Sequence, residues 1–165
     1  MKKQKKNYIL PLAAVLCILS LAVMVFALTR QEIQTEMGEF TPPPFDSSAV
    51  VGTPTVPDNL GWQELDAQVY KVGICGKFIS KGNTADVWLT NPESNTVWLK
   101  VRVLNEKGNN LGETGLIKPG EYVQSVELDR VPKVGTPIVL KIMAYQPDTY
   151  YSEGAVTLNT TISEE

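Results

Sequence analysis

The chain has 165 residues, and one long uncharged segment near its start leaves room for one ordinary domain. The formal net charge is −3, and because residues 1–30 carry +5, residues 31–165 carry −8, an acidic balance that argues against a nucleic acid partner. Histidine is absent, which removes the usual general base, the commonest metal ligand and every histidine-based triad.

Residues 1–7 form a basic tail, and residues 8–28 contain no charge. As a helix, residues 8–28 would span about 31 Å, the thickness of the hydrocarbon part of a bilayer. We therefore expect a transmembrane helix at 8–28 whose partner is the lipid bilayer. The positive-inside rule places the tail in the cytoplasm and the C-terminal domain outside the cell membrane. The alternative is a signal peptide cleaved after Ala27, although its apolar region would be long for one.

Cys17 and Cys75 are the two cysteines of the chain. Cys17 lies in the predicted membrane segment and Cys75 in the predicted domain, so we expect both to be unpaired. Cys75 lies in the run Gly73-Ile74-Cys75-Gly76, a setting that favours a small buried side chain over a reactive thiol.

Residues 29–58 are rich in Pro, Ser, Gly and acidic residues, a composition that favours extended chain and predicts a semi-rigid extracytoplasmic stalk. The apolar residues within 45–57 leave open that part of this stalk lies against the domain as an edge strand. Residues 59–165 are expected to form the domain. It opens on a short turn that tucks Trp62 under the sheet.

Short alternating apolar segments recur through the domain, separated by Gly, Pro and Asn. A series of seven or eight short strands predicts an antiparallel β-sandwich or barrel. The predicted strands are 68–72, 77–80, 85–90, 96–104, 111–117, 122–128, 138–145 and 155–162.

The stretch 86–102 carries the strongest local pattern. Two alternating runs flank the turn-forming residues 91–95, which predicts a β-hairpin. With Thr90 paired to Thr96, Trp88 and Trp98 stand side by side on the face away from the core. If the faces are reversed, both tryptophans point inward instead.

Residues 90–128 resemble bacterial extracytoplasmic immunoglobulin-like domains, through the run T-N-P-E-S-N-T-V-W-L-K-V-R-V-L-N-E-K-G-N-N-L-G-E-T-G-L-I-K-P-G-E-Y-V-Q-S-V-E-L. With the N-terminal segment, the chain resembles uncharacterised small single-pass surface proteins of Gram-positive bacteria. The resemblance implies an immunoglobulin-like sandwich of seven or eight strands. It implies no catalytic or binding residue, and fold likeness does not transfer function.

The candidate contact residues are Trp88, Trp98, Tyr150 and Tyr151. Adjacent tryptophans stack on sugar rings or anchor a protein partner, and the two tyrosines lie in a long loop between the last two predicted strands. The alternative is that these residues have only a structural role, in which the tryptophans stabilise the hairpin and one tyrosine closes the end of the sandwich. No pattern for a catalytic residue, a metal ligand or a cofactor is found.

The sequence thus favours a non-enzymatic, membrane-anchored interaction module with an unidentified protein partner in the cell envelope, as an accessory subunit of an envelope assembly. The alternative is a module that binds cell-wall glycan through an aromatic patch.

Overall fold

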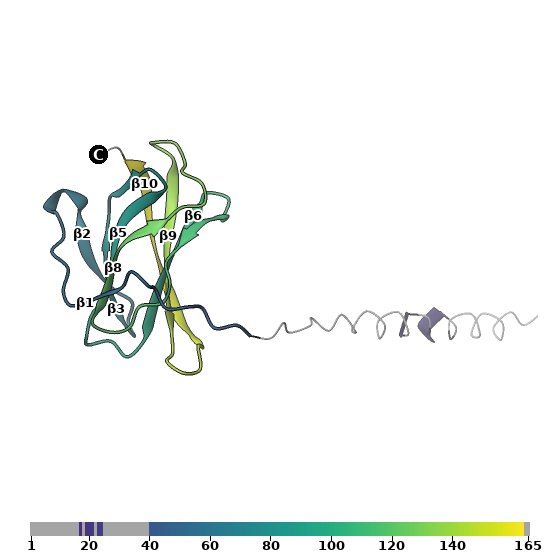
Figure 1. The fold of residues 1–165 in the computed structure, drawn as a ribbon. Coiled ribbons are helices and arrows are strands. Elements are labelled where there is room, and N and C mark those ends of the chain that lie inside the picture. The colour runs from purple at the N-terminus through teal and green to yellow at the C-terminus, as the bar shows by residue number, and fades with distance from the viewer. Residues whose placement is uncertain (1–16, 18, 22, 25–39, 164–165) are drawn as a thin grey trace, which may run out of the picture. The chain divides into compact units, whose positions relative to one another are not determined.

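A computed structural model describes residues 17, 19–21, 23–24 and 40–163 of the chain (Figure 1). The chain divides into two compact units, Met1–Thr41 and Pro42–Glu165. In the first unit, the described residues between 17 and 24 are helical. The helices of the described part include none long and apolar enough to cross a membrane. Most of the predicted transmembrane segment 8–28, and all of the tail 1–7, lie outside the described residues.

The second unit is all-β, as predicted. In the described part it contains ten strands and one short 3-10 helix. They are β1 (Val50–Val51), η1 (Asp58–Leu60), β2 (Trp62–Asp66), β3 (Lys71–Cys75), β4 (Phe78–Lys81), β5 (Thr84–Asn91), β6 (Trp98–Asn105), β7 (Asn110–Glu113), β8 (Glu121–Glu127), β9 (Pro137–Tyr145) and β10 (Ser152–Ser163).

Each of the eight predicted strands has an observed counterpart, from β3 to β10, with ends displaced by at most four residues. The pattern succeeds because apolar residues at every second position are buried on one face of a strand. Strand β2 was not predicted, since a turn was expected there.

The strands follow the order β1-β8-β5-β4-β10-β9-β6-β7, with β3 attached to β5 and β2 to β3. Neighbours pair antiparallel, except that β4 and β10 join through a short parallel pair at Phe78 and Ile162. We call β1–β5 with β8 the first half of the sheet, and β6, β7, β9 and β10 the second half. Figure 1 shows β2, β3, β5 and β8 on one side of the domain and β6, β9 and β10 on the other.

The core lies between the two halves. One buried cluster contains Val72, Val87 and Leu89 from the first half together with Leu99 and Ile142 from the second. Each of these side chains is fully removed from water. The alternate residues of the same strands therefore face outward, and every candidate contact residue on a strand lies on an outer face.

The predicted hairpin between β5 and β6 is wrong. β5 pairs with β3, β4 and β8, whereas β6 pairs with β7 and β9, so the connection 92–97 crosses from one half to the other. Alternation along a strand shows which face is buried, but it does not show which strand is the neighbour. Two strands that face each other across a core have the same pattern as two strands paired in a hairpin.

The compact domain begins earlier than predicted, at Pro42 instead of residue 59. Phe45 forms a parallel bridge with Leu116, and β1 pairs with β8, as the edge-strand alternative proposed. Asp46 accepts a hydrogen bond from the amide of Gly115 at 2.7 Å. Residues 42–58, predicted as stalk, therefore pack on the domain. We call residues 52–57, between β1 and η1, the strap.

Candidate functional site

Trp88 lies on the outer face of the first half, at a bulge of β5 between Asp86 and Leu89. Its φ of 46° is unusual for a bulky residue and marks the bulge, and its neighbours Val87 and Leu89 both belong to the core. The indole stacks on Tyr122 of β8 with ring centroids 6.1 Å apart. Trp88 and Val56 of the strap both pack against a small buried cluster of Leu60, Cys75 and Ile79. Trp88 is thus partly covered, and its Nε1 is buried and has no hydrogen-bond partner among the described residues.

Trp98 lies in the other half of the sheet, at the start of β6, so the predicted tryptophan pair does not exist. The ring of Trp98 instead contacts Phe45 edge-on at 4.8 Å between centroids, and Tyr150 at 5.2 Å. The Lys118 ammonium lies 4.7 Å from the centroid of the Phe45 ring, a cation–π contact. Phe45, Trp98 and Tyr150 form one surface group that we call the aromatic cluster.

Tyr150 and Tyr151 lie in the loop between β9 and β10, as predicted. Tyr150 has a φ of 58°, and its amide donates a hydrogen bond to the carbonyl of Gln146 at 3.0 Å, so the loop turns Tyr150 toward Trp98. Tyr151, the next residue, is 72% exposed. The structure therefore brings together two of the four predicted contact residues, and the third, Tyr151, extends the same loop into solvent.

Charged residues continue the outer face of β6 beyond Trp98. Lys100 and Arg102 alternate with core residues, and both contact Glu113 of β7, at 2.6 and 2.7 Å. Burial raises the pKa of Glu113, but hydrogen bonds from Lys100 and Arg102 outweigh it and hold that pKa below the ordinary value. Lys100 is almost fully buried, so Glu113 neutralises a cation that would otherwise be unpaired.

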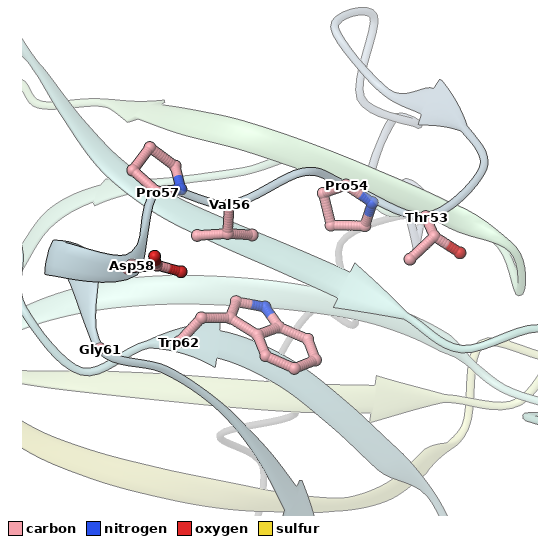
Figure 2. Close-up of a pocket in the computed structure, with 7 residues that line it drawn as sticks. All are labelled: Thr53, Pro54, Val56, Pro57, Asp58, Gly61 and Trp62. Atoms are coloured by element: carbon pink, nitrogen blue, oxygen red, sulfur yellow. The ribbon is translucent and has the colours of Figure 1, made fainter.

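A second aromatic site lies on the opposite half, where Trp62 of β2 and the strap line an open pocket of about 340 Å³ (Figure 2). The lining residues are Thr53, Pro54, Val56, Pro57, Asp58, Gly61 and Trp62. This site was not predicted from the sequence, because a turn was expected at Trp62 and the strap was assigned to the stalk, with its packing on the domain left open. The available signal was the presence of a tryptophan directly after a proline-rich segment.

The described residues include no group of three or more His, Cys, Asp and Glu side chains able to hold a metal ion. Cys75 is unpaired and buried, as predicted. Burial raises the pKa of its thiol to about 12, and the Asp86 carboxylate adds to the shift. A buried thiol held in the protonated form is a poor nucleophile. Cys17 is also unpaired.

Comparison with known proteins assigns the chain to no family. No family model and no curated protein matches the chain. Among solved structures, CopC from Methylosinus trichosporium OB3b is similar at 13% sequence identity and a TM-score of 0.36, covering 63% of this chain and 95% of that one. A TM-score of this size does not establish a shared fold.

Proposed function

We propose that this chain is a non-enzymatic interaction module that binds a protein partner through the aromatic cluster. Residues 8–28 anchor it in the cell membrane, with the N-terminus in the cytoplasm and the domain outside. In this role it serves as an accessory subunit of a cell-envelope assembly. The domain is an immunoglobulin-like sandwich of the kind carried by small surface proteins of Gram-positive bacteria.

The observation that carries the proposal is the edge-on contact of Trp98 with both Phe45 and Tyr150, on the surface of the domain. Phe45 is 40% exposed and Tyr151 72% exposed. Aromatic side chains provide a large contact area with few rotatable bonds, and Trp and Tyr dominate the binding energy of protein interfaces. The rings of the cluster already hold one another in place, so binding orders few additional side chains.

The immunoglobulin-like arrangement is supported by two halves of mostly antiparallel strands with the core between them. The membrane anchor is supported by the uncharged segment 8–28 beside a basic tail.

Photocrosslinking in the cells that make the protein tests the proposed interface. A benzoyl-phenylalanine placed at Tyr151 lies beside the aromatic cluster. The matched control is the same group at Val134, which is 53% exposed and lies before the start of β9, at the other end of the β9–β10 pair. We expect one dominant protein adduct from position 151 and none from position 134.

Substitution of the cluster makes the test specific. Phe45→Ala removes an exposed ring and leaves the strands in place, so the adduct at position 151 should fall at least fivefold while the protein level stays constant. No adduct at position 151, or equal adducts from both positions, would show that the cluster is not an interface.

A further inference from the structure

The cavity under the strap is separate from the aromatic cluster, since it lies on the outer face of the first half of the sheet. Its floor is the indole of Trp62, and its wall is the strap with Pro54 and Val56 (Figure 2). It is open to solvent on one side. Its volume of about 340 Å³ is at the small end of the range for ligand pockets.

The indole of Trp62 packs directly on the backbone of Gly73 in the neighbouring strand. β2 and β3 pair antiparallel, with Glu64 opposite Gly73. A Cβ built on Gly73 would collide with Cζ2 of Trp62 and lie 2.8 Å from Cε2, so the ring covers the bare backbone. Trp62 is nevertheless 40% exposed. The side chain therefore packs on β3 with one face and keeps apolar surface available for a ligand.

Polar groups complement this apolar surface. Asp58 begins η1, and Gly61 ends it in the left-handed region with a φ of 61°, which returns the chain to Trp62. Figure 2 shows the Asp58 carboxylate extending into the space between Val56 and the indole, and the nitrogen-bearing edge of the indole turned toward the strap. A hydrogen-bond acceptor and a donor thus lie at the margins of an aromatic surface.

We propose that this cavity binds one ring of a neutral saccharide. A sugar ring has an apolar C–H face that packs on an indole, and hydroxyl groups at its rim that donate to a carboxylate and accept from an indole N–H. Asp58 is the charged residue that lines the cavity, whereas Glu64 on β2 is paired with Lys71 at 3.2 Å. The Asp58 carboxylate therefore disfavours anionic sugars. An apolar ligand would desolvate Asp58 without replacing its hydrogen bonds.

This site goes beyond the proposed protein interface and does not depend on it. It also replaces the glycan platform expected at Trp88 and Trp98, which lie on different halves of the sheet. The same chain can hold a protein through the aromatic cluster and a glycan under the strap.

Titration of the purified full-length chain tests the proposal, in a polyoxyethylene detergent because that headgroup contains no sugar. The probes are the N-acetylglucosamine trimer and the glucose trimer, followed by tryptophan fluorescence and calorimetry. We expect saturable binding of at least one trimer. Asp58→Ala should weaken binding about tenfold, as expected for loss of a charged hydrogen bond. Trp62→Ala should abolish it.

Matched controls separate the site from general effects on folding. Glu106→Ala removes an exposed acid from a distant turn and should bind as the unchanged chain does. Trp62→Phe keeps a ring over Gly73 and should retain partial binding. Tetramethylammonium serves as a cationic probe for the same aromatic and acidic groups.

Three results would overturn the proposal. They are no binding of either trimer, binding that survives both Trp62→Ala and Asp58→Ala, and binding of tetramethylammonium but neither sugar. The last would identify a cation site. All of them leave the crosslinking test at Tyr151 unaffected, so a failure here is distinguishable from a failure of the proposed interface.

Discussion

The side-chain amide of Asn95 donates a hydrogen bond to the side-chain oxygen of Asn91 at 2.7 Å, in the connection that crosses between the two halves of the sheet. Asn91 is fully buried and donates in turn to the carbonyls of Val97 and Ile117. Asn95 also exchanges two hydrogen bonds with the backbone of Lys71 on β3. These two side chains therefore fix the crossing of the chain against strands on both sides of it.

Asn91→Ala should lower the free energy of unfolding by about 2 to 3 kcal/mol, because two buried carbonyls and the Asn95 amide lose their partner. Urea unfolding of the full-length chain measures the effect. Ser94→Ala is the matched control, since Ser94 is exposed in the same connection and should leave stability unchanged. Equal effects of the two substitutions would show that the connection is an ordinary surface loop.

The same connection explains how far the sequence predicts the fold. The strands β3 to β10 are predictable, because alternation depends on local burial. Asn91 and Asn95 were interpreted as turn formers, since Asn tolerates turn conformations. Their actual role depends on carbonyls of Lys71 and Ile117, which are distant in the sequence, and no local pattern contains that information.

The candidate site was also only partly predictable, because the local sequence shows which residues are exposed but not which distant residues they contact. Trp98 and Tyr150 were selected as exposed aromatics, and they do meet. Their third partner, Phe45, was predicted to lie in the stalk, because proline-rich composition indicates extended chain but does not show whether that chain packs on a domain. The Trp62 cavity depends on the same packing, so it was not predictable from composition.

Gly73→Ala tests the support of Trp62. The added methyl group has no space under the indole, so the ring must move away from β3. We expect a loss of about 1 to 3 kcal/mol in the free energy of unfolding, typical of overpacking, and a red shift of tryptophan fluorescence. In a Trp62→Ala background the same change should be nearly neutral. A full loss in that background would mean that the effect comes from β3 itself.

Cys75 should make stability depend on pH in the alkaline range. Its thiol has a pKa of about 12 in the folded chain because of burial and the Asp86 carboxylate, against 9.0 for the ordinary thiol. Below pH 9 the thiol is protonated in both the folded and the unfolded chain, and its contribution to the free energy of unfolding is complete. As the pH rises from 9 toward 12, the unfolded chain ionises first, and the contribution is lost.

The free energy of unfolding of the native chain should therefore fall more steeply above pH 9 than that of Cys75→Ala. Thiol labelling provides a second measurement. In a Cys17→Ser background at neutral pH, Cys75 should react with a maleimide in urea but not in the folded protein. Rapid labelling of the folded protein would place the thiol at the surface.

Glu113 should make stability depend on pH in the acidic range. Burial raises the pKa of its carboxyl, but the hydrogen bonds from Lys100 and Arg102 give a net lowering from the ordinary value of 4.5. A lowered pKa in the folded state contributes stability that is complete above about pH 4.5 and is lost as the pH falls through the folded value.

Glu113→Gln leaves the nearly buried Lys100 ammonium without a charged partner, and it should cost about 1 to 3 kcal/mol at neutral pH. The difference in unfolding free energy between native and Glu113→Gln chains, measured by urea unfolding, should shrink below pH 4.5. Glu121→Gln, a half-buried acid on β8, serves as the control and should show a smaller loss at neutral pH. A difference that stays constant through the acidic range would mean that the Glu113 carboxylate does not stabilise the fold through its charge.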